Sequence, residues 1–346
     1  MDKKQKIEKL KEYVKPGNTF CPFLFLHYFV DTDKKSKFCC LDIDSIGNSV
    51  VDYNDSIYVE ARDNILNNKK LTQCTKCYDS EEKNIISLRQ KTILDDIIEM
   101  DRVEILFDQI EKHNQGLDIQ PLWYDLRISN NCNLSCIMCG PQYSSTWAKK
   151  LGIKHKHLSF DPDIKISPNT YKIQLAGGEP FMIKKFSNFL EKINNLNCEI
   201  IVNTNATIIN QTLLDQLKRF KNTTIVLSVD GYGELNEKIR TGTIWSTVVK
   251  NIKIFQKENF NLLVNTCVQK DNINHLYELG VWLEGIGIDD WMLSRLFNPV
   301  ELKWENQDNI DIENLKQTLK LKSIQRNNIS ISFLENVINS QKNNCA

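Results

Sequence analysis

Three cysteines in the middle of the chain have the spacing with the clearest chemical meaning. The segment reads Cys132-Asn133-Leu134-Ser135-Cys136-Ile137-Met138-Cys139, a CxxxCxxC pattern. Thiolates this close can bind three irons of a cubic iron-sulfur cluster and leave the fourth iron without a protein ligand. Zinc is the alternative, but a closed zinc site needs four ligands and the neighbouring sequence supplies no fourth. The spacing therefore favours an iron-sulfur cluster with one iron open to another molecule.

Such a loop needs a scaffold, and the sequence around it predicts alternating strands and helices. Short β-branched runs predict six strands: 124–129, 172–176, 199–204, 224–229, 262–269 and 290–296. Amphipathic stretches between them predict helices over 182–193, 211–220, 245–257 and 274–285. This βα alternation is typical of a parallel sheet whose chemistry lies at the carboxyl ends of the strands.

The residues at these strand ends are polar or glycine. The second strand is followed by Gly177-Gly178-Glu179-Pro180, where two glycines allow a ligand close to the backbone and a carboxylate can accept a hydrogen bond from an ammonium group. The later strands end near Asn205, Ser228, Asp230 and Gln269, and Arg240 follows the fourth. Each of these is also an ordinary turn residue when taken alone.

Together these motifs resemble the radical S-adenosylmethionine (SAM) enzymes. In that family a CxxxCx-aromatic-C loop follows the first strand of a partial (β/α)6 barrel, and SAM binds the open iron. Met138 stands where the family usually has an aromatic residue, and it can still cover the adenine. The resemblance implies an α/β fold, a partial TIM-like barrel, with a [4Fe-4S] cluster held by Cys132, Cys136 and Cys139.

The resemblance also assigns cofactor contacts at the strand ends. It implies that Gly177, Gly178 and Glu179 cradle the SAM amino group and that Asn205 belongs to the turn after the third strand. It further implies that Ser228 and Asp230 lie near the SAM ribose. Arg240 would pair with the SAM carboxylate, and Gln269 would lie at the adenine.

The first 80 residues contain a second group of cysteines. Cys74 and Cys77 form a CxxC pair, and Cys21 with Cys39 would complete a four-thiolate set, Cys40 being the alternative to Cys39. The spacing leaves zinc and iron-sulfur both open. The segment is similar to the twitch or SPASM extensions that hold auxiliary iron-sulfur clusters in many radical SAM enzymes, although most of those follow the barrel. That likeness implies an auxiliary cluster, preferably [4Fe-4S].

The other cysteines and the overall composition suggest no further site. Cys198, Cys267 and Cys345 are expected to be small buried hydrophobic residues. The chain has 346 residues, 41% of them hydrophobic, which is enough for a large core, and 44 basic residues balance 44 acidic ones. This neutrality argues against non-specific binding to nucleic acid. Met1–Lys15 lacks a signal peptide's apolar core and no run suits a membrane span, so a cytoplasmic location is expected.

These observations predict three regions and one kind of reaction. Residues 1–119 form a cysteine-rich region and residues 120–300 form the barrel. Residues 301–346 form a C-terminal helix or strand that packs on the barrel. The resemblance implies reductive cleavage of SAM to a 5'-deoxyadenosyl radical that takes hydrogen from a peptide or protein side chain, for epimerisation, crosslinking or oxidation. A flavodoxin or ferredoxin would supply the electron. The alternatives are a small-molecule substrate and a non-catalytic iron-sulfur or zinc protein.

Overall fold

The structure is a computed structural model that describes all residues except 43–45, 47–48, 155–163, 165 and 345–346. The chain forms two compact units. One unit comprises Met1–Leu126 and Ile164–Ile173, and the other comprises Arg127–Asp163 and Gln174–Ala346. One sheet carries the strands in the order β2-β1-β3-β4-β5-β6-β7-β8, and the pairings with a described register are parallel except for β1 with β2.

The unit that begins at Met1 is mainly helical. Its helices are α1 (Lys3–Val14), α2 (Phe23–Leu26), α3 (Ser56–Leu66), the 3-10 turn η1 (Thr72–Cys74), α4 (Thr75–Glu82), α5 (Leu88–Lys91), the π-helix η2 (Thr92–Glu99) and α6 (Val103–Asn114). Its strands are β1 (His27–Val30), β2 (Ser36–Lys37) and most of β3 (Trp123–Arg127). Strand β1 was not predicted, because Phe23–Val30 is one apolar run without alternation; all four of its residues are buried.

The other unit contains the remaining five strands that the sequence predicted for the barrel, except that the first two residues of β4 belong to the first unit. They are β4 (Lys172–Ala176), β5 (Glu199–Thr204), β6 (Asn222–Ser228), β7 (Asn261–Val268) and β8 (Trp291–Arg295). Between them lie α7 (Ser145–Lys150), η3 (Pro180–Met182), α8 (Lys184–Glu191), α9 (Gln211–Leu217), α10 (Glu234–Ile239), α11 (Trp245–Lys257), η4 (Ile273–His275) and α12 (Leu276–Gly285). The predicted α/β fold with a partial barrel is confirmed.

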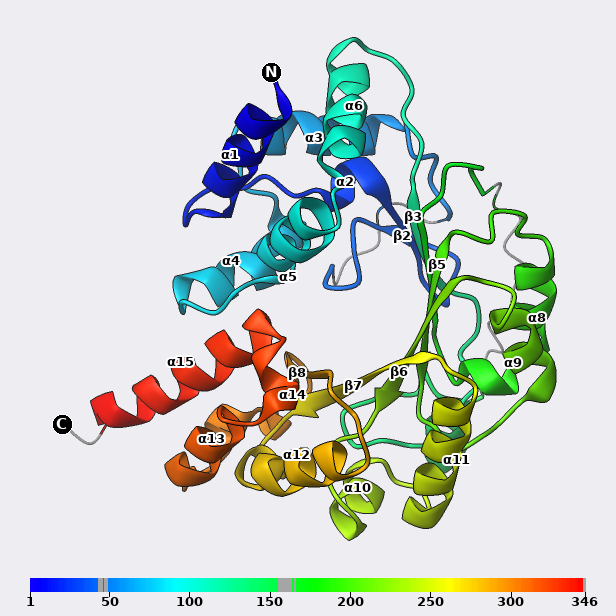
Figure 1. Cartoon of the computed structure of the whole chain (residues 1–346), viewed down its shortest axis with the longest axis vertical. Coiled ribbons are helices and arrows are strands. Elements are labelled where there is room, and N and C mark those ends of the chain that lie inside the picture. The colour runs from blue at the N-terminus through cyan, green and yellow to red at the C-terminus, as the bar shows by residue number, and fades with distance from the viewer. Residues whose placement is uncertain (43–45, 47–48, 155–163, 165, 345–346) are drawn as a thin grey trace. The chain divides into compact units, whose positions relative to one another are not determined.

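Helices cover one face of these strands and leave the other face partly exposed. In Figure 1, α8, α9 and α11 lie along one side of β5 and β6. The strand residues on the covered face are fully buried: Ile200, Val202, Ile225, Leu227 and Val264. Alternate residues point to the opposite face, and most of them are only partly buried. Apolar residues at helical spacing, such as Val248, Ile252 and Phe255 in α11, fill the space behind the sheet.

The C-terminal segment is helical and protects the edge of β8. After the 3-10 turns η5 (Val300–Leu302) and η6 (Trp304–Asn306) come α13 (Ile312–Thr318), α14 (Lys322–Gln325) and α15 (Asn328–Asn344). The backbone N–H of Leu293 in β8 donates to Ser330 Oγ of α15 at 2.8 Å, so an edge donor is satisfied by a helix. Within the described residues, every helix is too short or too polar to cross a bilayer.

Candidate active site and a second cysteine cluster

The CxxxCxxC loop follows β3 and is held in place by its own backbone. Ser135 N and Ile137 N donate to the carbonyls of Thr241 and Ile239, both at 2.9 Å. The loop is therefore paired with the residues on either side of Arg240, at the end of α10. This pairing fixes the loop before any cluster binds.

The start of α7 supplies a second set of contacts that the sequence did not predict. Ser145 Oγ and Thr146 Oγ1 donate to the carbonyl of Cys132 at 3.0 and 2.8 Å, and Trp147 Nε1 donates to the carbonyl of Cys136 at 2.8 Å. Ser144 caps the helix by accepting from Trp147 N. The run Ser144-Ser145-Thr146 shortly after the cysteines was the signal for this cap.

The three thiols lie in surroundings that oppose their ionisation. Burial raises the pKa of Cys132 to about 12 and that of Cys136 to about 11, and it also raises the pKa of Cys139. The positive charge of Arg240 counteracts part of this rise in pKa at Cys136 and Cys139. Because iron binds the thiolate, cluster binding at this loop must displace protons.

The Gly177-Gly178 turn approaches the loop so closely that no side chain fits. Gly177 and Gly178 have φ of +87° and +56°. A Cβ on Gly178 would lie 2.1 Å from the Asn131 carbonyl oxygen, beside Cys132. Glu179 N donates to that same oxygen at 2.7 Å. The glycines are therefore required for the turn to pack against the cysteine loop.

Glu179 is fully buried and joins two strand ends. Its carboxylate accepts hydrogen bonds from Phe181 N, Thr204 Oγ1 and Asn205 N at 3.0, 2.7 and 2.7 Å. Burial raises its pKa to about 7, although these three donors and Arg240 act in the opposite direction. A carboxylate has about four lone-pair directions, so one remains for a ligand.

The residues after β5 extend the contacts to the cysteine loop. Asn205 Nδ2 donates to Asn133 Oδ1 at 3.0 Å and lies 3.9 Å from Cys132 Sγ. Ala206, the next residue, adopts a left-handed φ of 57°. Asn205 is therefore placed against the candidate cluster loop.

Two predicted SAM residues contact each other: Asp230, just after β6, and Arg240, just after α10. Asp230 is completely buried, and its Oδ2 lies 2.7 Å from Arg240 Nε, while its Oδ1 accepts from Cys267 N at 2.7 Å. The resemblance assigned these two residues separately, to the ribose and to the carboxylate of SAM. In the protein, Asp230 also holds the Arg240 guanidinium.

Gln269 and Cys267 differ from the surrounding core. The Gln269 side chain is fully buried, yet neither its Oε1 nor its Nε2 has a hydrogen-bond partner among the described residues. Such orphaned amide groups are costly unless a ligand satisfies them. Cys267, expected to be an ordinary core residue, is partly exposed near Asp230 and Arg240, and burial raises the pKa of its thiol to about 12. Ser228 and Met138 are also partly exposed.

The Met1–Leu126 part contains the second cysteine cluster. Cys21, Cys39, Cys74 and Cys77 all line one cavity, whereas Cys40 is exposed and does not line it. They come from separate elements: Cys21 precedes α2, Cys39 follows β2, Cys74 ends η1 and Cys77 lies in α4. Burial raises the pKa of Cys74 to about 12, and the neighbouring Cys77 adds to the rise. Within the described ranges, no three or more His, Cys, Asp or Glu side chains are spaced to hold a single metal ion.

The comparisons identify the family of the barrel region. Residues 126–282 match the model of the Radical SAM superfamily. This region is a radical SAM domain. The match agrees with what the cysteine loop and the strand ends predicted for the same region.

Curated relatives match only part of the chain. An uncharacterized protein of Methanocaldococcus jannaschii is 27% identical over 47% of this chain and 58% of its own. The GTP 3',8-cyclase of Campylobacter lari is 26% identical over 42% of this chain and 46% of its own. The chain thus spans about half the length of these curated relatives. The solved structure of Streptococcus suis SuiB bound to precursor peptide SuiA has 17% identity and a TM-score of 0.43, covering 70% of this chain and 52% of that one.

Proposed function

We propose that this radical SAM enzyme cleaves SAM at a [4Fe-4S] cluster bound by Cys132, Cys136 and Cys139 and abstracts hydrogen from an amide-containing substrate such as a peptide. The observation that carries the SAM site is the Gly178 turn, which passes so close to the backbone beside Cys132 that only glycine fits. The buried and unpartnered amide of Gln269 independently indicates a missing polar ligand. The residues present therefore fit a cluster with SAM.

When bound, the cluster with SAM supplies one-electron cleavage of a carbon-sulfur bond to give methionine and a 5'-deoxyadenosyl radical. The protein residues bind and orient. Gly177 and Gly178 bring their turn against the cysteine loop, Glu179 offers its remaining lone pair to the SAM amino group, and Gln269 hydrogen-bonds the adenine. Asp230 holds Arg240 so that the guanidinium is fixed near the cluster loop and can pair with the SAM carboxylate.

SAM cleavage is the direct test. Anaerobically reconstituted protein with dithionite and SAM should form 5'-deoxyadenosine, and Cys136→Ala should form none. Cys198→Ala is the matched control, because Cys198 is a buried cysteine at the start of β5. Equal 5'-deoxyadenosine formation by Cys136→Ala and Cys198→Ala would disprove the assignment.

For the N-terminal site we propose an auxiliary iron-sulfur cluster, with [4Fe-4S] as the first choice. Four thiols around one cavity match the ligand number of such a cluster. Backbone N–H groups of Leu88 and Arg89 donate to the Cys77 thiol, a contact that also suits a cluster-bound thiolate. With four protein ligands this cluster would accept or relay an electron rather than bind substrate.

Iron content tests the auxiliary cluster. Two cubane clusters give about eight irons per chain, and the Cys74→Ala/Cys77→Ala double variant should lose about four of them. Cys40→Ala, on the exposed neighbour, should keep all of them. A wild type with about six irons would indicate a smaller auxiliary cluster. One with about four irons and one zinc would make the site a zinc site instead.

A row of uncharged polar side chains supports an amide-containing substrate. It lies on the partly exposed face of the sheet and comprises Gln174, Asn203, Ser228, Asn265 and Ser294. Gln174 Nε2 donates to Asn203 Oδ1 at 3.1 Å, and Ser294 Oγ donates to Asn265 Oδ1, so the amides are oriented. Side-chain amides both donate and accept hydrogen bonds, which matches the peptide group.

A small-molecule substrate is the second candidate, because one curated relative is a GTP 3',8-cyclase. Adding a pool of synthetic peptides to the SAM cleavage assay should increase 5'-deoxyadenosine formation and change the mass of one peptide. GTP should do neither. Stimulation by GTP and not by peptides would replace the peptide proposal with nucleotide chemistry.

A further inference from the structure

Arg89 is a completely buried cation beside the four N-terminal thiols. Its side chain is 1% exposed, and it lines the same cavity as Cys21, Cys39, Cys74 and Cys77. A buried guanidinium requires compensation by charge and hydrogen bonds. The arrangement of those partners shows what Arg89 holds together.

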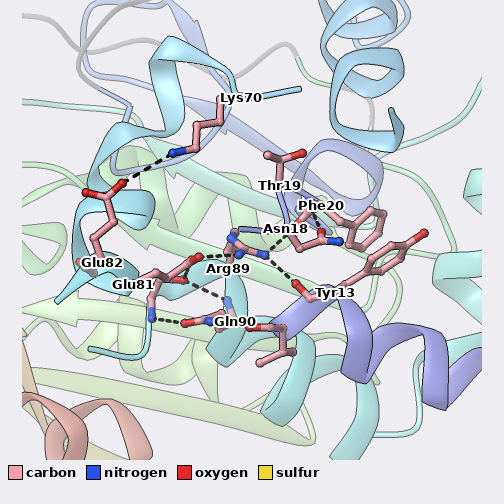
Figure 2. Close-up of polar contacts among 12 residues, drawn as sticks. Tyr13, Asn18, Thr19, Phe20, Lys70, Glu81, Glu82, Arg89 and Gln90 are labelled. Carbon is pink, nitrogen blue, oxygen red and sulfur yellow. Dashed lines mark hydrogen bonds and ion pairs between the residues drawn. The ribbon is translucent and has the colours of Figure 1, made fainter. Parts of the chain in front are cut away.

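Three segments of the chain meet at the guanidinium. Arg89 Nη2 pairs with Glu81 Oε2 at 2.5 Å, and Nη1 donates to the carbonyls of Tyr13 and Phe20 at 2.9 and 3.0 Å (Figure 2). Phe20 immediately precedes Cys21, and Glu81 lies one helical turn after Cys77 in α4. Arg89 therefore ties two cysteine-bearing segments together, one through the Phe20 carbonyl and the other through the Glu81 carboxylate.

Two further side chains hold the Arg89–Glu81 pair. Ser87 Oγ donates to Glu81 Oε1 at 2.5 Å. Gln90, which forms a capping box with Ser87, donates to the carbonyl of Val14 at 2.6 Å. The pair is thus part of a closed network, and Glu81 is itself only 6% exposed.

One donor of Arg89 is left over. Its Nε is buried and has no hydrogen-bond partner among the residues that the structure describes. An unmet buried donor on a residue that lines a cavity points to a ligand in that cavity. Thiolates and cluster sulfides are acceptors that would satisfy it.

We propose that Arg89 is the positioning residue of the N-terminal iron-sulfur site, and that the Arg89–Glu81 pair sets the reduction potential of the cluster bound there. The inference rests on the proposed auxiliary cluster. Reduction adds one electron and makes the cluster more negative, so a buried cation favours the reduced form and a buried carboxylate opposes it. Removing either charge alone should shift the potential, and the two shifts should have opposite signs.

The experiment measures the midpoint potential of the N-terminal cluster in the full-length chain. Replacing Cys132, Cys136 and Cys139 with alanine leaves only this cluster, which can be titrated with dithionite and followed by electron paramagnetic resonance. In this background Arg89→Gln should lower the potential and Glu81→Gln should raise it. Arg89→Lys keeps the charge and should stay near the parent value, although it loses the two-pronged hydrogen bonding.

Arg62 provides the matched control. It is equally buried and bonds the carbonyls of Leu24 and Tyr53, but it does not line the cysteine cavity. Arg62→Gln should leave the potential unchanged even where it lowers stability.

The possible outcomes separate the two proposals. Shifts of the same sign in Arg89→Gln and Glu81→Gln, or no shift in either at full iron content, would overturn the role of the pair and leave the cluster in place. If the parent chain binds no iron at the N-terminal site, both the cluster and this inference are wrong. Lower iron content in Arg89→Gln than in Arg62→Gln would support the positioning role.

Discussion

At the scale of single residues, backbone conformation rather than side-chain chemistry shapes the proposed SAM site. Gly178 has a positive φ and also no space for a Cβ, whereas Ala206 tolerates a positive φ with its methyl group fully buried. A glycine can therefore be required for two separate reasons: a positive φ, or a neighbouring backbone too close for a Cβ. They can be tested separately because the chain contains glycines that meet only one of them.

We expect Gly178→Ala to weaken SAM binding. The added Cβ would lie 2.1 Å from the Asn131 oxygen, so the turn or the cysteine loop must move. Isothermal titration with SAM should show an affinity at least about tenfold weaker. Gly152→Ala is the control, since Gly152 has φ +63° but no atom within 4 Å of the place where a Cβ would lie. It should cost about 1 kcal/mol of stability and leave SAM affinity intact. Equal loss in both variants would contradict the role of close approach.

We expect Ala206→Gly to lose less stability than Ala148→Gly. A left-handed alanine costs about 1 kcal/mol, which glycine does not, and this offsets the greater freedom of glycine in the unfolded chain. Ala148→Gly, at an equally buried position in α7, should instead lose about 1 kcal/mol. Urea unfolding of both variants decides this, and a larger loss at Ala206 would refute it.

At the scale of elements, strand ends are connected through side chains that the family likeness assigned to the cofactor. Glu179 bonds Thr204 and Asn205 at the end of β5 as well as Phe181 in its own turn. Asp230, just after β6, bonds the backbone of Cys267 in β7. The same residues therefore hold the strands in place and face the proposed SAM site, which gives the apoprotein a pH-dependent stability.

We expect the free energy of unfolding of the apoprotein to fall as pH rises from about 4.5 to about 7. Glu179 keeps its proton to a higher pH when folded than when unfolded, so the native state holds more protons in this window. The Glu179 contribution amounts to about 3 kcal/mol and levels off above pH 7. Urea unfolding at several pH values should show a shallower slope in Glu179→Gln. An unchanged slope would mean that another group titrates.

At the scale of the whole chain, the sequence predicted regular elements well and long-range pairing poorly. The barrel strands and helices follow from periodicity, and the four N-terminal cysteines were grouped because metal sites need several thiolates. Nothing in the spacing indicated that Asp230 would pair with Arg240, or Arg89 with Glu81. Such pairs depend on which charged residues folding buries, and an Arg or Glu in a polar helix looks like a surface residue. The prediction that Cys267 is an ordinary core residue failed for a related reason. Its apolar sequence neighbours indicate a buried strand, but they carry no information about which residues lie near the end of that strand.

The segment Ile164–Ile173 belongs to the unit that begins at Met1, and charges tie it there. Lys172 Nζ and Arg102 Nη1 both pair with Asp96, and Lys172 lies 4.3 Å from the Trp123 ring. We expect Asp96→Asn to cost about 3 kcal/mol, because a carboxylate shared by two largely buried cations is lost. Asp95→Asn, which breaks a more exposed pair with Lys91, should cost less than about 1 kcal/mol. If urea unfolding shows similar losses of unfolding free energy in the two variants, the Asp96 ion pairs stabilise the protein no more than the exposed Asp95 pair does.

Because Ile164–Ile173 belongs to the unit that begins at Met1, the order of synthesis limits when that unit can fold. The unit with the four N-terminal cysteines is not finished when Leu126 leaves the ribosome, since its last segment follows the whole CxxxCxxC loop in the sequence. Both sets of thiols are therefore already synthesised when the first unit can close. A nascent chain stalled before Lys172 would lack the partner of Asp96, and truncation at residue 126 would leave this unit incomplete.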